Sequence, residues 1–200
     1  MHTNRVHKQE LSREQGQALV QLARLTLENT LQHSNRSPGP ELRNILSEPE
    51  LQKSQGTFVT LHIRGSLRGC IGSLTADQPL VESVQENAVN AALKDPRFPP
   101  LTASELEKTH IEVSVLTEPR PLEYSDARDL LTKLRPNIDG VILQKGMARS
   151  TFLPQVWEQL PDAEQFLNHL CLKAGLPENA WKTEHPDIST YQAQYFEEPK

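Results

Sequence analysis

The 200-residue sequence predicts an α+β protein, because stretches with helical spacing of apolar residues intermix with strand-like alternating stretches. These stretches do not follow the regular strand–helix–strand cadence of a doubly wound parallel sheet. We therefore expect a largely antiparallel or mixed sheet packed with helices, arranged as a larger and a smaller lobe. Residues 1–10 read as a polar tail and residues 11–200 as a single domain, whose lobe boundary the sequence leaves open.

The first predicted helix starts at the capping-box sequence Ser12-Arg-Glu-Gln15 and carries an apolar stripe as far as Leu31. The connector that follows is weakly patterned. Two stretches rich in β-forming residues, near 57–64 and 67–74, then predict a pair of strands. The pair Gly65-Ser66 between them suits a tight hairpin turn.

A second helix is expected to open at Asp77-Gln-Pro79, because proline at the first helical position gives up no hydrogen bond. The prolines of Asp95-Pro-Arg-Phe-Pro-Pro-Leu101 favour extended backbone after it. Thr102 and Glu105 have the spacing of a capping box for a short helix. Alternation of apolar and polar residues then predicts a strand over Ile111–Leu116.

The C-terminal half adds helices, a hairpin and a final strand. A helix is expected over Asp126–Leu134, and a hairpin with a Lys145-Gly146 turn over residues 140–152. Helical patterns return around Gln155–Leu160 and over Ala163–Ala174. The segment from Ile188 to Phe196 reads as a last edge strand.

Charge and composition argue against several functions. The net charge is −5 and acidic and basic residues are interspersed, so neither nucleic acid nor an anionic membrane is an expected partner. The N-terminus lacks the apolar core of a signal peptide and no apolar run approaches the roughly 18 residues of a membrane span, which favours the cytoplasm. Two cysteines make no disulfide framework, and zinc-type spacings are missing, so we expect neither a metal nor a cofactor.

The main candidate site is the stretch Leu67-Arg-Gly-Cys-Ile-Gly72. On a regular strand Arg68 and Cys70 would share a face, and a guanidinium about 6 Å from a thiol would lower the thiol pKa by roughly half to two units. Cys70 is therefore a candidate nucleophile or acid/base, with Arg68 as its activating cation and His62 as the nearest histidine in sequence. The alternative is that Cys70 is a small packed hydrophobe.

Two glycines of the same stretch, Gly69 and Gly72, are candidate ligand contacts, because glycine within a strand often marks a bulge or a place where a ligand approaches closely. The hairpin register decides what surrounds the thiol. With a two-residue loop Cys70 would lie opposite Leu61, on the apolar face. With a three-residue loop and a bulge Cys70 would face Thr60, and Arg68 would face His62. The turn pair favours the first register; the arginine favours the second, since an unpaired arginine does not sit in a core.

Further candidates lie outside the hairpin. Arg97 stands on irregular backbone, where it could bind an anion or tie down a loop carboxylate. Thr151 and Gln155 flank a Phe-Leu-Pro turn and could contribute hydrogen bonds to a cleft, although Thr151 could simply cap the following helix. Glu112 is expected on a solvated sheet face. Cys171 is in phase with apolar neighbours, which indicates core packing.

Several sequence blocks occur in an order that points to one family. They are the hexapeptide, Phe58-Val-Thr-Leu, Ala92-Leu-Lys-Asp-Pro-Arg-Phe-Pro-Pro-Leu101, Glu112-Val-Ser-Val-Leu116, Gly140-Val-Ile-Leu, Thr151-Phe-Leu-Pro-Gln-Val156 and Lys173-Ala-Gly-Leu176. Together they resemble the AMMECR family, called protein A of the AmmeMemoRadiSam system in prokaryotes, over roughly residues 12–196.

The resemblance implies an α+β fold of two lobes, with the hexapeptide lining a functional cleft, and it implies no established reaction. Prokaryotic members are linked with a Memo-like protein and a radical-SAM protein, which suggests a shared pathway and a modifying role. The expected function is thus that of an enzyme, or an enzyme subunit, acting on a small molecule or a protein. The alternative is a non-catalytic binding or adaptor module in which Cys70 is structural. The sequence leaves the oligomeric state open.

Overall fold

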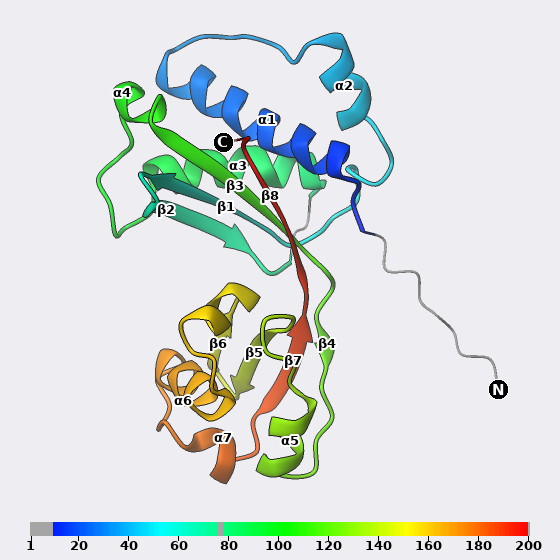
Figure 1. The fold of residues 1–200 in the computed structure, drawn as a ribbon, viewed down its shortest axis with the longest axis vertical. Coiled ribbons are helices and arrows are strands. Elements are labelled where there is room, and N and C mark those ends of the chain that lie inside the picture. The colour runs from blue at the N-terminus through cyan, green and yellow to red at the C-terminus, as the bar shows by residue number, and fades with distance from the viewer. Residues whose placement is uncertain (1–9, 76–77, 200) are drawn as a thin grey trace, which may run out of the picture. The chain divides into compact units, whose positions relative to one another are not determined.

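The computed structural model describes residues 10–75 and 78–199. The chain divides into two compact units, of which unit 1 comprises Met1–Val115 and Gln194–Lys200 and unit 2 comprises Leu116–Ala193. Each unit contains a four-stranded sheet with its own helices (Figure 1). Every strand pair with a described register is antiparallel, so the predicted α+β class is confirmed.

Unit 1 contains a sheet with the strand order β2-β1-β3-β8. Its strands are β1 (Thr57–Ile63), β2 (Ser66–Ser73), β3 (Thr109–Leu116) and β8 (Ala193–Glu197). Its helices are α1 (Arg13–Leu31), α2 (Pro40–Leu46), α3 (Leu80–Leu93) and α4 (Ala103–Leu106). Helix α3 packs against β1 and β2, and α1 packs against α3.

The core of unit 1 follows from the alternation of its strands. Val59 and Leu61 on β1 and Ile111 and Val113 on β3 are fully buried among the apolar side chains of the helices. Since neighbouring residues on a strand point to opposite faces, the residues between them form a second, more polar face of the sheet. That second face carries Thr60, and it includes the thiol described below.

Helix capping in unit 1 matches the sequence patterns. Ser12 accepts a hydrogen bond from the Gln15 backbone N–H and Gln15 returns one to the Ser12 N–H, so the predicted capping box of α1 is confirmed. The same reciprocal pair joins Thr102 and Glu105 at α4.

Two expectations for this unit differ from the structure. Asp77 lies outside the described residues, and α3 begins at Leu80 with Pro79 as its N-cap instead of its first helical residue. Helix α2 forms where the sequence indicates only a connector. A seven-residue helix spans too few turns to display an apolar period, which is why the pattern missed it.

Unit 2 contains a sheet with the order β4-β7-β5-β6. Its strands are β4 (Arg120–Pro121), β5 (Gly140–Lys145), β6 (Ala148–Phe152) and β7 (Asp187–Tyr191). Its helices are α5 (Ala127–Lys133), the 3-10 helix η1 (Pro154–Glu158), α6 (Ala163–Lys173) and α7 (Ala180–Thr183).

Aromatic packing organises the core of unit 2. Trp157 and Phe166 are fully buried and stack with their ring centroids 3.7 Å apart. Cys171 is fully buried beside them, so the predicted packing role of this cysteine is confirmed. The predicted hairpin forms as β5–β6, but its turn is Gly146-Met147, one residue after the predicted Lys145-Gly146.

The predicted single edge strand over Ile188–Phe196 is wrong. The segment forms two strands, β7 and β8, which belong to different sheets. Strand β7 is not at an edge, because it pairs with β4 on one side and β5 on the other. Alternation predicts only that a residue is extended; it cannot show that the chain leaves one sheet and enters another near Gln192.

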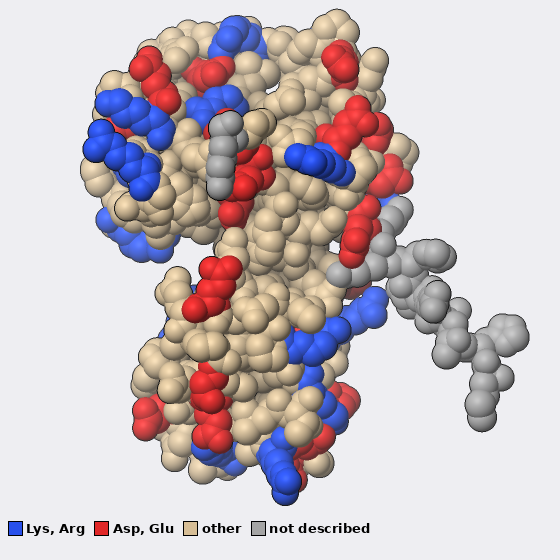
Figure 2. Space-filling view, viewed as in Figure 1, with Lys and Arg blue, Asp and Glu red and all other residues tan. Residues whose placement is uncertain are grey.

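Lys and Arg side chains and Asp and Glu side chains are both present on the visible face of each unit (Figure 2). Within residues 10–75 and 78–199, no helix has the combination of length and apolar character that a membrane crossing requires.

Candidate functional site

The hexapeptide lies on β2, the strand at one end of the unit 1 sheet. The turn that precedes it is Arg64-Gly65, both residues having positive φ (52° and 78°), so it falls one residue before the predicted Gly65-Ser66 turn. Two positive φ values are typical of a type I′ hairpin turn. The two-residue loop was predicted, and its position was wrong.

The register of the hairpin also departs from the first alternative. Cys70 pairs with Thr60, as in the second alternative. However, Gly69 pairs with Leu61 and Leu67 with His62, which leaves Arg68 as the extra residue of a β-bulge. The expectation that Arg68 faces His62 is therefore wrong, because a bulged residue has no direct partner across the strands.

Cys70 begins a row of polar side chains across three strands. Thr60 pairs with Cys70 on one side and with Glu112 of β3 on the other, so Cys70, Thr60 and Glu112 form what we call the polar row. The Thr60 hydroxyl donates a hydrogen bond to Cys70 Sγ at 3.3 Å. Cys70 is partly exposed as a residue, and its sulfur has a polar neighbour in the Thr60 hydroxyl.

Side chains of the segment after α3 hold the backbone of Cys70. The Cys70 N–H donates to Asp95 Oδ2 at 2.8 Å, and Arg97 Nη2 lies 3.4 Å from the Cys70 carbonyl oxygen. The Arg97 guanidinium also binds both carboxylate oxygens of Asp95, at 3.0 and 2.7 Å. We call this arrangement the Asp95 clamp.

Charge and burial separate the two members of the clamp. Asp95 is only 4% exposed, whereas the Arg97 side chain is 54% exposed. The Arg97 guanidinium holds the pKa of Asp95 well below its usual range, assisted by the backbone N–H groups of Cys70 and Arg97. Of the two predicted roles of Arg97, tying down a loop carboxylate is the one the structure contains.

The predicted lowering of the Cys70 pKa by Arg68 is wrong. Burial raises the pKa of the Cys70 thiol, against the Thr60 hydrogen bond and the charge of Arg97, which lower it. Asp95 and Glu112 raise this pKa further. The thiol is therefore protonated at neutral pH.

Arg68 is engaged elsewhere. Its guanidinium forms an ion pair with Glu105 of α4, with contacts of 3.1 and 3.2 Å, and it lies 5.9 Å from the ring centroid of Phe98. Arg97 lies 5.5 Å from the same ring. Both arginines thus hold the segment after α3 against the hexapeptide, and the pairing lowers the pKa of Glu105 to about 2.

Contacts with the rest of unit 1 occupy the space at the two glycines. A Cβ at Gly69 would lie 2.2 Å from the Ala91 carbonyl oxygen of α3. A Cβ at Gly72 would lie 2.2 Å from the Thr57 carbonyl oxygen and 2.4 Å from the Phe58 ring. Close packing therefore explains both glycines. Their presence gives no evidence that a ligand approaches the strand here.

His62 lies two cross-strand pairs away from Cys70, paired with Leu67 and with His110. The hydrogen bond to Cys70 Sγ comes from the Thr60 hydroxyl instead of a histidine. Among the described residues, no group of three or more His, Cys, Asp or Glu side chains could hold a metal ion.

Thr151 and Gln155 belong to unit 2. Thr151 lies on β6, where its hydroxyl donates to the Val141 carbonyl at 3.0 Å and lies 3.0 Å from the Tyr191 hydroxyl. The expectation that Thr151 caps the following helix is wrong, because η1 starts at Pro154 with Leu153 as its N-cap. Gln155 lies within η1, is partly buried and has interactions of its own.

Sequence reasoning missed Asp95 as a site residue and expected Glu112 to be solvated. Asp95 accepts from the Cys70 N–H, and Glu112 lies beyond Thr60 in the same cross-strand row, so the sheet and the segment after α3 bring these distant positions near Cys70. The Asp-Pro-Arg-Phe pattern was the available signal for Asp95, since an arginine two residues from an aspartate can pair with it.

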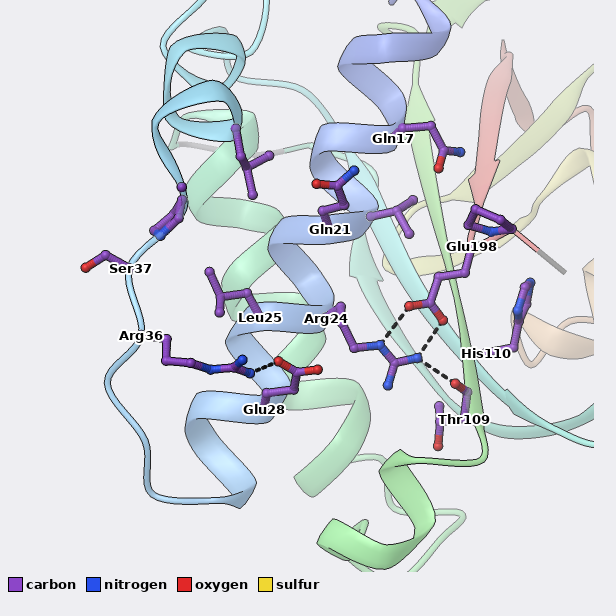
Figure 3. A pocket seen from close by; sticks show the side chains of 15 residues that line it. Gln17, Gln21, Arg24, Leu25, Glu28, Arg36, Ser37, Thr109, His110 and Glu198 are labelled. Atoms are coloured by element: carbon purple, nitrogen blue, oxygen red, sulfur yellow. Dashed lines mark hydrogen bonds and ion pairs between the residues drawn. The ribbon is translucent and has the colours of Figure 1, made fainter.

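Unit 1 also contains a groove of about 780 Å³ along the outer side of α1 (Figure 3). In this view the guanidinium of Arg24 lies between Glu198 and the carbonyl oxygen of Thr109, and Arg36 pairs with Glu28. Both arginines of the groove are therefore engaged within the protein. The sequence did not reveal it, because its walls come from α1, the segment before α2, the start of β3 and the residues after β8.

These features define an α+β protein of two compact units, one of which presents a partly exposed thiol on a bulged hairpin. The AMMECR1 family model matches residues 20–196. A protein of Methanothermobacter thermautotrophicus is 40% identical over 190 residues, covering 94% of this chain and 96% of its own length. Protein MJ0810 of Methanocaldococcus jannaschii is 41% identical over 192 residues, covering 94% and 92%. The chain belongs to the AMMECR1 family.

A solved structure supports the fold. The crystal structure of the uncharacterized protein PH0010 from Pyrococcus horikoshii matches with a TM-score of 0.83 and 37% identity, over 94% of this chain and 93% of that one. The names of these relatives state no reaction.

Proposed function

We propose that this protein is an enzyme, or a subunit of an enzyme, in a modification pathway, and that Cys70 acts as an acid/base group starting from its protonated form. The observation that carries this proposal is the position of Cys70 on the polar face of the sheet, hydrogen-bonded to Thr60. A cysteine used only for packing belongs on the opposite face, among the buried aliphatic side chains of the core.

The surroundings of the thiol suit a group that gives up a proton and takes it back. A substrate atom that gains negative charge would receive the proton from Sγ. The thiolate left behind would keep the Thr60 hydrogen bond and the nearby charge of Arg97, both of which favour it. Burial, Asp95 and Glu112 favour the thiol and so favour its reprotonation. An acid/base group needs such a balance, whereas a resting nucleophile needs a stable thiolate.

The Asp95 clamp would contribute by position. It holds the N–H of Cys70, and the exposed part of Arg97 lies on the same side of β2. A fixed backbone keeps the sulfur in one place, and positioning of this kind supports proton transfer over a short distance.

The second candidate is a non-catalytic binding or adaptor module in which Cys70 is structural. One observation favours it: close packing explains Gly69 and Gly72, and the Glu105 ion pair explains Arg68, without any ligand. In that case the hexapeptide would serve to fit β2 tightly against α3.

The proposed partners follow from the family resemblance. They are a Memo-like protein and a radical-SAM protein, with a small molecule or a protein as substrate. The proposed compartment is the cytoplasm, where the free thiols of Cys70 and Cys171 would stay reduced. Co-purification from a cell that encodes both partner types tests this association.

Thiol labelling of the native protein against pH tests the proposed chemistry, read at peptide level by mass spectrometry. Cys70 should label in the folded state, with a midpoint above the ordinary thiol value of about 8.5. Cys171 is the internal control, because its full burial should delay labelling until unfolding. A Cys70 midpoint below about 8 would contradict the protonated starting form. A Cys70 that labels only on unfolding would favour the adaptor module.

Substitutions then separate chemistry from packing. Cys70→Ala and Cys70→Ser should both fold. If the thiol is the reacting group, neither variant should restore the phenotype of a strain that lacks the protein. A variant that loses stability but retains the phenotype would instead assign Cys70 to packing.

A further inference from the structure

A second, smaller pocket lies in unit 1, beside the first half of α3. Its volume is about 340 Å³, at the lower end of the range for small-molecule sites. The residues that line it are polar and include Thr57, Ser73, Gln78, Ser83, Glu86 and Asn87. We propose that this pocket binds a small organic cation, namely a primary ammonium compound with additional hydrogen-bond donors.

Ser83 provides the first argument. Its side chain lines the pocket and is only 4% exposed, yet its hydroxyl has no hydrogen-bond partner among the described residues. Buried hydroxyls in folded proteins are nearly always partnered, because an unpartnered one destabilises the fold. A ligand in the pocket would supply the missing partner.

The orientation of two amide side chains provides the second argument. Asn87 Nδ2 donates to the Thr57 carbonyl oxygen at 3.2 Å, and Gln78 Nε2 donates to Glu86 Oε2 at 2.8 Å. Because both of these partners are acceptors, the amide orientations are fixed and the amide oxygens remain as acceptors. The Glu86 carboxylate adds a negative charge. The pocket therefore favours a ligand that donates hydrogen bonds and carries positive charge.

The helix dipole does not reverse this preference. An anion would need the free N–H groups at the start of α3, but the Leu80 and Val81 N–H groups donate to the carbonyl oxygens of Lys53 and Leu51. Ser83, Glu86 and Asn87 lie on or beyond the second turn of the helix, where the influence of the dipole has faded.

This proposal is independent of the proposed chemistry at Cys70. Thr57 and Ser73 form a pair three residues along the hairpin from the Thr60–Cys70 pair, about 10 Å away at the usual rise per residue. The Thr57 side chain points to the opposite face from Thr60. Loss of binding here would leave the labelling of Cys70 unchanged.

The experiment is a titration of the full chain with ethanolamine, followed by NMR and by thermal unfolding, with glycerol and acetate as the neutral and anionic comparisons. Ethanolamine should bind saturably, shift signals of residues around Ser83 and Glu86, and raise the unfolding temperature with concentration. Glu86→Gln should weaken binding by about tenfold or more, since it removes a charge-assisted contact.

Two serine variants form a matched pair. Ser83→Ala should unfold at the same or a higher temperature than the parent without ethanolamine, and it should bind ethanolamine several-fold more weakly. Ser114→Ala is the control, because Ser114 is the other buried hydroxyl without a partner among the described residues and it does not line this pocket. Its affinity for ethanolamine should match that of the parent.

Three results would overturn the proposal. They are no saturable binding of ethanolamine, equal responses to glycerol or acetate, and unchanged affinity in both Ser83→Ala and Glu86→Gln.

Discussion

Replacing Asp95 by asparagine should destabilise unit 1 and should increase the reactivity of Cys70. The substitution keeps the size of the side chain but replaces one oxygen by an NH2 group. Asp95 Oδ2 accepts from the Cys70 N–H and from Arg97 Nη2, and Oδ1 accepts from the Arg97 backbone N–H and Nε. Whichever way the amide turns, two of these donors would face another donor.

The magnitude follows from burial. An unmade buried hydrogen bond costs about 1–3 kcal/mol. The Arg97 side chain is 54% exposed and its guanidinium can turn to water, so one backbone N–H, that of Cys70 or that of Arg97, loses its acceptor without compensation. We expect a loss of about 2–3 kcal/mol in the free energy of unfolding at pH 7.

The pH dependence has a definite sign. In the folded protein the pKa of Asp95 lies below its usual range. The stabilisation by the ionised carboxylate is therefore complete above the ordinary aspartate value of about 3.9, and it is lost as the pH falls from there toward the folded-state pKa. Within that window the difference between parent and variant should shrink by about 1.4 kcal/mol per pH unit.

Urea unfolding followed by circular dichroism measures the free energy, and hydrogen exchange of peptides from β2 locates the change in unit 1. The matched control is Asp139→Asn, which removes a carboxylate of similar burial from its pair with Arg135 in unit 2. Both tryptophans, Trp157 and Trp181, lie in unit 2, so fluorescence reports the control directly. Only the Asp95 variant should label faster at Cys70.

Two results would refute this reasoning. A loss below about 0.5 kcal/mol at pH 7 would mean that the clamp does not stabilise the fold. A difference that stays constant from about pH 5 to pH 2.5 would mean that the pKa of Asp95 is not depressed.

Three other substitutions test the neighbourhood of the hexapeptide. Gly69→Ala should lower the free energy of unfolding in urea by about 2–3 kcal/mol, because its Cβ would meet the Ala91 carbonyl oxygen at 2.2 Å. A loss no larger than the roughly 1 kcal/mol expected for Gly65→Ala, where only the left-handed backbone matters, would contradict this. Arg68→Gln should leave the labelling midpoint of Cys70 unchanged; a rise of about half a unit or more would restore Arg68 as the cation of the thiol. In the same variant the pKa of Glu105 should return from about 2 toward its ordinary value of 4.5, which an NMR titration measures. Glu112→Gln should lower the labelling midpoint of Cys70, because the charge of Glu112 raises the thiol pKa. An unchanged midpoint would show that the charge of Glu112 does not act on the thiol.

The sequence was sufficient where the structure depends on local chemistry. The caps of α1 and α4 were readable because Ser12 and Gln15, and Thr102 and Glu105, satisfy each other within one turn. The buried face of β3 was readable because alternation on a strand is strictly local. These features do not depend on which distant segment lies opposite.

The hairpin shows where local reading fails. The turn lies at Arg64-Gly65, one residue before Gly65-Ser66, and Arg68 is bulged, so Cys70 pairs with Thr60 instead of with Leu61. The earlier turn without the bulge would have paired Cys70 with Val59, on the buried apolar face of β1. The bulge is favoured by long-range contacts, since Arg68 pairs with Glu105, which lies 37 residues away.

The same limit applies to the charges around the thiol. The sequence offered Arg68 as the nearest cation, but distance along a strand is a poor guide when a bulge redirects the side chain. The charged groups that shift the pKa of Cys70 are Asp95, Arg97 and Glu112, which lie 25 or more residues away in sequence. Only the packing of the segment after α3 and the pairing of β1 with β3 bring them to the sulfur.

The two cysteines show why burial alone does not assign a role. Burial raises the pKa of both thiols, Cys70 and Cys171. Cys171 lies among aromatic and aliphatic side chains, where a backbone hydrogen bond at Trp181 favours its thiolate but burial outweighs it. Cys70 has a hydroxyl donor and a guanidinium that favour the thiolate, opposed by two carboxylates that favour the thiol. Asp95 cannot take the proton, because its pairing with Arg97 keeps it ionised. The groups around Cys70 therefore favour both of its protonation states, which makes the face of Cys70 the place to test for acid/base chemistry.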